Sequence, residues 1–113
     1  MTSKPNERTV EQRVNMRGGN GTVQLEALFP AGLPAHCRMA SVIKLEKGCS
    51  IGAHRHDGEG EIFYVLSGVA RYYDNGVPRL LEPGDAAVAY QGQHAVEGVS
   101  DETCCLMAVI ITD

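Results

Sequence analysis

Three of the four histidines in the chain, together with one glutamate, form a pattern that could hold a metal ion. His54 and His56 are two residues apart, and side chains at that spacing on a β-strand point to the same face. A turn-forming segment, residues 57–60, lets the chain double back before Glu61, and His94 follows downstream. Three imidazoles and a carboxylate make a mixed nitrogen and oxygen site suited to a first-row transition metal.

Glycines at both ends of this pattern strengthen the interpretation. Residues 48–68 resemble the first motif of the cupin superfamily, because they match its glycines, both histidines and its glutamate in order and spacing. The second cupin motif is only partly present. Gly84, Gly92 and His94 fit it, whereas Tyr90 stands where the family has a proline. The resemblance extends over about residues 37–111.

The resemblance implies both a fold and a ligand set. It predicts an all-β protein, a double-stranded β-helix or jelly-roll barrel, with residues 21–113 as a single cupin domain and residues 1–20 as an N-terminal arm. In the family these ligand positions hold Mn, Fe, Ni, Cu or Zn, and nothing in the sequence selects among them. The implied ligands are His54, His56, Glu61 and His94.

Several neighbouring residues are candidates for a substrate pocket. Phe63 shares the strand face of the glutamate ligand and should form an apolar wall of the cavity. Arg38 could clamp an anion, although a surface arginine is the favoured interpretation. Tyr90 and Gln93 precede or adjoin the last histidine and could contact a substrate, or be ordinary loop residues. Glu59 is a candidate general acid, with a solvated turn carboxylate as the favoured alternative.

The remaining sequence indicates many short strands separated by turns, which is typical of a barrel or jelly roll. The Asn75-Gly76 pair predicts a tight hairpin because both residues tolerate positive φ. The expected strands are residues 22–29, 38–46, 62–66, 69–73, 77–81, 86–89, 95–99 and 104–111.

Composition excludes several classes of function. The 113 residues include 14 acidic and 10 basic side chains, for a net charge of −4, and no basic cluster suggests nucleic-acid binding. No apolar run approaches the ~20 residues that span a membrane, and residues 1–8 lack the apolar core of a signal peptide, so we expect a cytoplasmic protein. The four cysteines match no disulfide or zinc framework. They are interpreted as small core fillers, the alternative being that one lines the metal cavity.

Three classes of function remain open. The first, which is the function we predict, is a small metalloenzyme acting on a carboxylated or enolisable molecule, of dioxygenase, isomerase or decarboxylase type. The second is a module that binds or senses a small molecule without turnover, and the third is a barrel whose histidines no longer bind metal. The fold alone does not choose among them. Oxalate decarboxylases resemble two cupin domains in one chain, which disfavours that activity here. We also expect a homodimer, with the N-terminal arm or the strand at residues 22–29 at the interface.

Overall fold

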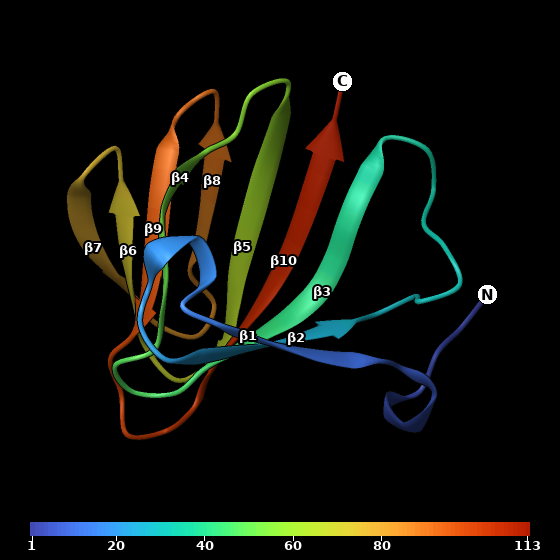
Figure 1. The fold of residues 1–113 in the computed structure, drawn as a ribbon, viewed down its shortest axis with the longest axis horizontal. Coiled ribbons are helices and arrows are strands. Elements are labelled where there is room, and N and C mark those ends of the chain that lie inside the picture. The colour runs from blue at the N-terminus through green and yellow to red at the C-terminus, as the bar shows by residue number, and fades with distance from the viewer.

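The computed structural model describes residues 1–113 as ten β-strands and two single-turn 3₁₀ helices (Figure 1). In chain order the elements are η1 (Pro5–Glu7), β1 (Val10–Val14), η2 (Met16–Gly18), β2 (Thr22–Ala27), β3 (Cys37–Leu45), β4 (Ser50–Arg55), β5 (Glu59–Ser67), β6 (Ala70–Asp74), β7 (Val77–Leu81), β8 (Ala86–Tyr90), β9 (Gln93–Gly98) and β10 (Cys104–Thr112). Neither helix has the length or the apolar character needed to span a membrane.

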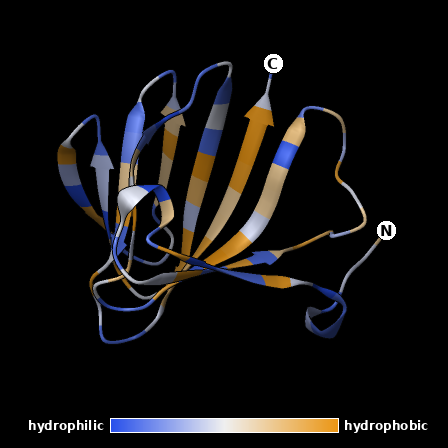
Figure 2. Ribbon diagram, viewed as in Figure 1, coloured by the Kyte–Doolittle hydropathy of each residue, from blue (hydrophilic) through white to orange (hydrophobic).

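The strands form two sheets that close into a double-stranded β-helix. One sheet has six strands in the order β1-β2-β3-β10-β5-β8, and the other has four in the order β4-β9-β6-β7. All neighbouring strands run antiparallel. The long strand β10 lies between β3 and β5 and is the most continuously hydrophobic element of the sheet (Figure 2). The fold expected from the sequence is confirmed.

Alternating side chains give the barrel its core. On β5, Phe63 and Val65 are buried, whereas Ile62, Tyr64 and Leu66 between and beside them are exposed. The period of two follows from the pleat of a strand, which sends successive side chains to opposite faces. Buried residues from both sheets meet in one hydrophobic cluster of 14 members. The interior is therefore apolar except at Ser41, His56, Glu61 and His94.

Turn chemistry explains how the strands are connected. Asn75 and Gly76 both have positive φ, 49° and 85°, which is the conformation of a two-residue hairpin between β6 and β7. Gly68 (φ 70°) ends β5 where a Cβ atom would lie 2.6 Å from the Cα of Cys104. Glycine is required there both for the backbone conformation and for the close approach of the two segments.

The N-terminal segment differs from the expected arm. Residues 10–14 form β1, which pairs with β2 of the same chain from Val10 opposite Glu26 to Val14 opposite Thr22. Arg8, which precedes β1, also contacts β2 through an ion pair with Glu26 (2.9 Å). The sequence shows no strand period because all five residues of β1 are exposed, so neither face selects apolar side chains.

Candidate metal centre

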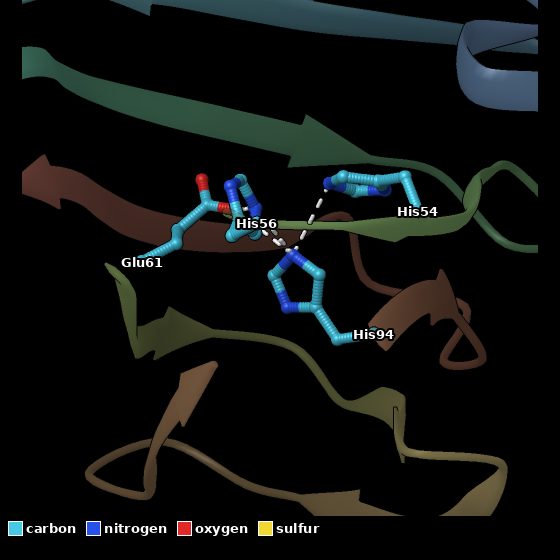
Figure 3. Close-up of side chains that lie close together, drawn as sticks. All are labelled: His54, His56, Glu61 and His94. Atoms are coloured by element: carbon cyan, nitrogen blue, oxygen red, sulfur yellow. Dashed lines mark hydrogen bonds and ion pairs between the residues drawn. The ribbon is translucent and has the colours of Figure 1, made fainter. Parts of the chain in front are cut away.

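The four predicted ligands come from both sheets and meet inside the barrel (Figure 3). His54 on β4 and His94 on β9 are direct cross-strand partners. His56 follows the last residue of β4, and Glu61 lies on β5 in the opposite sheet. Closing the barrel therefore brings together side chains up to 40 residues apart in sequence.

The ligand atoms are close enough to share one cation. The Nε2 atoms of His56 and His94 are 3.0 Å apart, and those of His94 and His54 are 3.2 Å apart. An Oε1 of Glu61 lies 3.0 Å from the Nε2 atoms of both His56 and His94. All four ligand atoms lie within 4.8 Å of one another. This group is the set that the sequence predicts.

The other nitrogen of each imidazole is held by a partner in the protein. Nδ1 of His54 donates to the carbonyl oxygen of Gly52 (2.8 Å), and Nδ1 of His56 donates to the carboxylate of Glu59 (2.8 Å). These oxygens can only accept, so each Nδ1 carries the proton and each Nε2 of the neutral ring presents a lone pair. Nδ1 of His94 lies 3.1 Å from the hydroxyl of Tyr72. Such outer contacts orient metal-binding histidines and fix their tautomers.

Burial makes this arrangement fit a cation. His56, Glu61 and His94 are 2%, 5% and 1% exposed, so water screens their charges and lone pairs poorly. Burial is also the main reason that the pKa of His54 is lowered, which favours the neutral form that can bind metal. Lone pairs and a carboxylate at these distances repel one another unless a proton or a cation lies between them. The donor set therefore fits a divalent transition metal.

A cavity of about 260 Å³ connects the cluster to solvent. His54, His56 and Glu61 line its floor, and apolar side chains such as Ile43, Ile51 and Ile110 form its walls. Charged side chains of β1, η2 and β3 lie around it: Glu11, Arg13, Arg17 and Arg38. The cavity thus combines three of the candidate metal ligands with several arginines.

The predicted pocket residues lie in different places. Phe63 is 2% exposed, and its ring stacks on that of His94 with centroids 5.2 Å apart, so it supports a ligand from behind and does not line the cavity. Arg38 does line the cavity, although its side chain is half-exposed and ion-paired with Glu59 (2.7 Å). Tyr90 and Gln93 are exposed and do not line this cavity. They line two other depressions, and the one at Gln93 also includes His94.

The alternative for the cysteines is also settled by position. All four are free thiols, and none lines the cavity. Cys104 is completely buried in the hydrophobic core, where burial raises the pKa of its thiol to about 11. The favoured interpretation of a core filler fits Cys104, which lies in the apolar cluster, and the alternative of a cavity-lining cysteine finds no support.

The sequence analysis did not predict the positions of three residues near the candidate site. Glu59 is a hydrogen-bond partner of His56 and is only 15% exposed at its side chain. Tyr72 is the partner of His94, and Arg17 lies at the cavity. Tyr72 alternates with its neighbours on β6 as a core residue does, so its burial had a signal, whereas its pairing with His94 depends on how β6 lies beside β9.

Comparison with known proteins agrees with the fold. Residues 41–110 match the family model described as "Cupin domain". An oxalate-binding protein of Thermotoga maritima is 34% identical over 98% of this chain and 93% of its own length. A crystal structure from the same organism, described as a predicted oxalate decarboxylase, has a TM-score of 0.91 at 34% identity and full coverage of both chains.

A more distant structure shows how widely the fold is shared. An RmlC-like cupin from Shewanella frigidimarina is 19% identical, with a TM-score of 0.78 over 99% of this chain and 90% of that one. That likeness concerns the fold alone. The family match covers more than half of the residues, and the relative from Thermotoga maritima covers nearly all of them. The chain belongs to the cupin family.

Proposed function

We propose that the protein binds a divalent transition metal through His54, His56, Glu61 and His94 and uses it to hold a small carboxylate ligand in the cavity. The observation that supports this proposal is the convergence of three Nε2 atoms and one buried carboxylate. Three of these four residues, His54, His56 and Glu61, line a solvent-connected cavity. The three outer hydrogen bonds keep the lone pairs of the rings directed toward that point.

The spacing of the ligand atoms bears on the kind of ion. Two atoms at right angles and about 2.1 Å from one cation are about 3.0 Å apart. The shorter distances in the cluster, 3.0 and 3.2 Å, are compatible with that spacing. Because a ligand needs a free position beside the four side chains, we propose a five- or six-coordinate ion among Mn, Fe, Ni, Cu and Zn. Such an ion keeps one or two positions free for a ligand. When bound, it supplies Lewis acidity toward an oxygen ligand or a centre for O₂.

Oxalate is the first ligand to test. The Thermotoga maritima relative is called an oxalate-binding protein, and carboxylate oxygens suit both a transition metal and the arginines at the cavity. Apolar side chains such as Ile43, Ile51 and Ile110 offer no hydrogen bonds to a ligand, which favours a compact ligand whose polar atoms point to the metal and to the arginines.

Binding without turnover is the function that the side chains support best. Glu59, the candidate general acid, is held by both Arg38 and His56, and the hydrogen bond from Arg38 is the main reason that its pKa is lowered to about 2. It is therefore ionised and engaged, and does not offer a proton near neutral pH. A metal-dependent enzyme of dioxygenase, isomerase or decarboxylase type is the second candidate, favoured by the relative described as a predicted oxalate decarboxylase.

The proposal is tested by metal content and ligand binding. Protein purified without chelator should contain near-stoichiometric transition metal by inductively coupled plasma mass spectrometry. His56→Ala should lose tight metal binding because it removes a buried ligand, whereas His36→Ala should retain it, since His36 is exposed and bonds to the backbone of Asp113. Isothermal titration should then show oxalate binding only to the metal-loaded protein. Equal metal retention in both variants would contradict the assigned ligands.

We further propose a homodimer in the cytoplasm. Strand β2 is paired on both edges, so β1 is the part of the expected interface that remains available. It exposes Val10 and Val14, which a partner subunit could cover. Light scattering after size-exclusion chromatography should give twice the chain mass, and Val14→Glu should reduce it. A monomer mass for the unmodified protein would contradict the dimer.

A further inference from the structure

The turn at η2 lies directly over the strand that carries His54. Figure 1 shows this turn in front of β4 and β9. Arg17 occupies its centre with φ 56°, a left-handed conformation that residues other than glycine and asparagine adopt rarely. Strained backbone of this kind persists only where surrounding contacts enforce it, and it is frequent at binding sites.

Those contacts are visible on both sides of the turn. A Cβ atom at Gly52 would collide with the carbonyl oxygen of Arg17, and one at Gly19 would collide with that of Ser50. The backbone of Asn20 donates to the hydroxyl of Ser50 (2.9 Å), and the backbone of Ser50 donates back to the carbonyl of Asn20 (2.9 Å). The turn therefore packs closely on β4 at Gly52, two residues before His54. This packing fixes the backbone position of Arg17.

Arg17 is also the cavity arginine that lacks an anionic partner. Arg13 forms an ion pair with Glu11 (2.8 Å), and Arg38 forms one with Glu59 (2.7 Å). The side chain of Arg17, which lines the cavity, makes no hydrogen bond or ion pair with the protein. A guanidinium at the cavity wall without a partner is available to bind an anion.

The charges of the cavity define which anion fits. The two ion pairs are neutral, so Glu61 and Arg17 are the charges that remain, and they cancel. With a divalent cation on the histidines, the cavity carries a net charge of about two positive units. A ligand with two negative charges neutralises it, whereas a monocarboxylate leaves one positive charge uncompensated.

We propose that Arg17 is the residue that selects dicarboxylates, by binding the oxygens of the ligand that face the cavity entrance while the four-ligand site holds the others. This inference rests on the proposed metal-dependent binding function. It adds the class of ligand, a dicarboxylate, and the residue that recognises it, Arg17. The fixed backbone of η2 limits how far the guanidinium can retreat, so a planar, two-oxygen contact is favoured over a diffuse attraction.

A comparison of oxalate with glycolate isolates the effect of the second carboxylate on binding. Both molecules have two carbons and two adjacent oxygen donors, but only oxalate has two negative charges. Arg17→Asn removes the charge and keeps a residue that tolerates positive φ. Arg79→Asn removes the same charge from β7, remote from the cavity. Metal content, thermal stability and the two dissociation constants are measured for the unmodified protein and both variants.

We expect Arg17→Asn to keep its metal and to bind oxalate roughly 10- to 100-fold more weakly, because a charge-assisted contact is lost. Glycolate binding should change less than about threefold, and Arg79→Asn should behave as the unmodified protein. Arg17→Lys should fall between, since it keeps the charge without the planar fork.

The possible failures are distinguishable. If the unmodified protein holds metal but binds no oxalate, the proposed function fails. If it binds oxalate and Arg17→Asn binds it equally well, only the role of Arg17 is overturned. Equal losses for oxalate and glycolate, or loss of metal from Arg17→Asn, would also overturn that role, because Arg17 would then act on the site as a whole and not on the second carboxylate.

Discussion

Replacing Tyr72 with phenylalanine tests whether the hydrogen bond between Tyr72 and His94 contributes to stability and to metal binding. Tyr72 is 4% exposed and His94 is 1% exposed, so no water can take the place of the hydroxyl that lies 3.1 Å from Nδ1 of His94. A buried donor left without a partner costs about 1–3 kcal/mol. We therefore expect the free energy of unfolding of the metal-free protein to fall by roughly that amount.

The same change should weaken metal binding. Nδ1 of His94 would lose the contact that fixes its ring orientation and tautomer, and losing such outer partners typically lowers metal affinity by about 10- to 100-fold. Stability is measured by urea denaturation of protein freed of metal, and affinity by competition with a chromogenic chelator. The stacking of Phe63 on His94 stays in place, which limits the expected loss.

The neighbouring tyrosine supplies the control. Tyr73 lies on the same strand with its side chain on the opposite face, and its hydroxyl makes no hydrogen bond with the protein. Tyr73→Phe should therefore match the unmodified protein in both assays. If Tyr72→Phe were as stable and bound metal as tightly as Tyr73→Phe, the hydrogen bond to His94 would not position the ligand, and the reasoning from outer contacts would be refuted.

Three further predictions follow from burial and backbone conformation. Burial raises the pKa of Tyr72 to about 12. Its contribution to stability is therefore fully present below its unfolded pKa of about 10 and is lost as pH rises through 12. Between pH 9 and 11.5, urea denaturation should show a larger fall in the free energy of unfolding for the unmodified protein than for Tyr72→Phe. Burial also raises the pKa of Cys104 to about 11, so its thiolate at pH 8 is about 100-fold scarcer than that of an ordinary thiol, and a disulfide reagent should modify it only after unfolding; rapid labelling of Cys104 in the native protein would argue against the core assignment. Gly68→Ala should destabilise the protein by several kcal/mol because its Cβ would meet backbone at 2.6 Å, whereas Gly76→Ala, with open space around it, should lose only ~1–2 kcal/mol to backbone strain; equal thermal shifts would contradict the steric account.

The candidate metal ligands were predictable because local rules and a motif place them. Residues two apart on a strand share a face, which puts His54 and His56 together, and the alternation of β5 places Glu61 and Phe63 inside. The direct pairing of His54 with His94 depends on the register of β4 against β9, which no local signal sets. The expected strand at residues 77–81 has the bounds of β7, whereas the ends of the other expected strands differ from the observed ones by up to three residues.

The pocket was less predictable because it depends on parts of the chain with weak patterns. Tyr90 and Gln93 lie close to His94 in sequence, but the strands turn their side chains outward. Arg17 lies far from every motif, on a turn whose left-handed backbone is enforced by contacts with Ser50 and Gly52. Only the packing of η2 on β4 brings it to the cavity.

The origin of the ligands in two sheets has a consequence for the lifetime of the native state. His54 and His94 belong to the four-stranded sheet, and Glu61 belongs to the six-stranded sheet. A cation bound by all of them would tie the sheets together, so the barrel could not open without breaking bonds to it. Contacts of such long sequence separation form late in folding, and interactions that form late slow unfolding more than they speed folding. Bound metal would therefore act chiefly by lowering the unfolding rate, which lengthens the lifetime of each folded molecule.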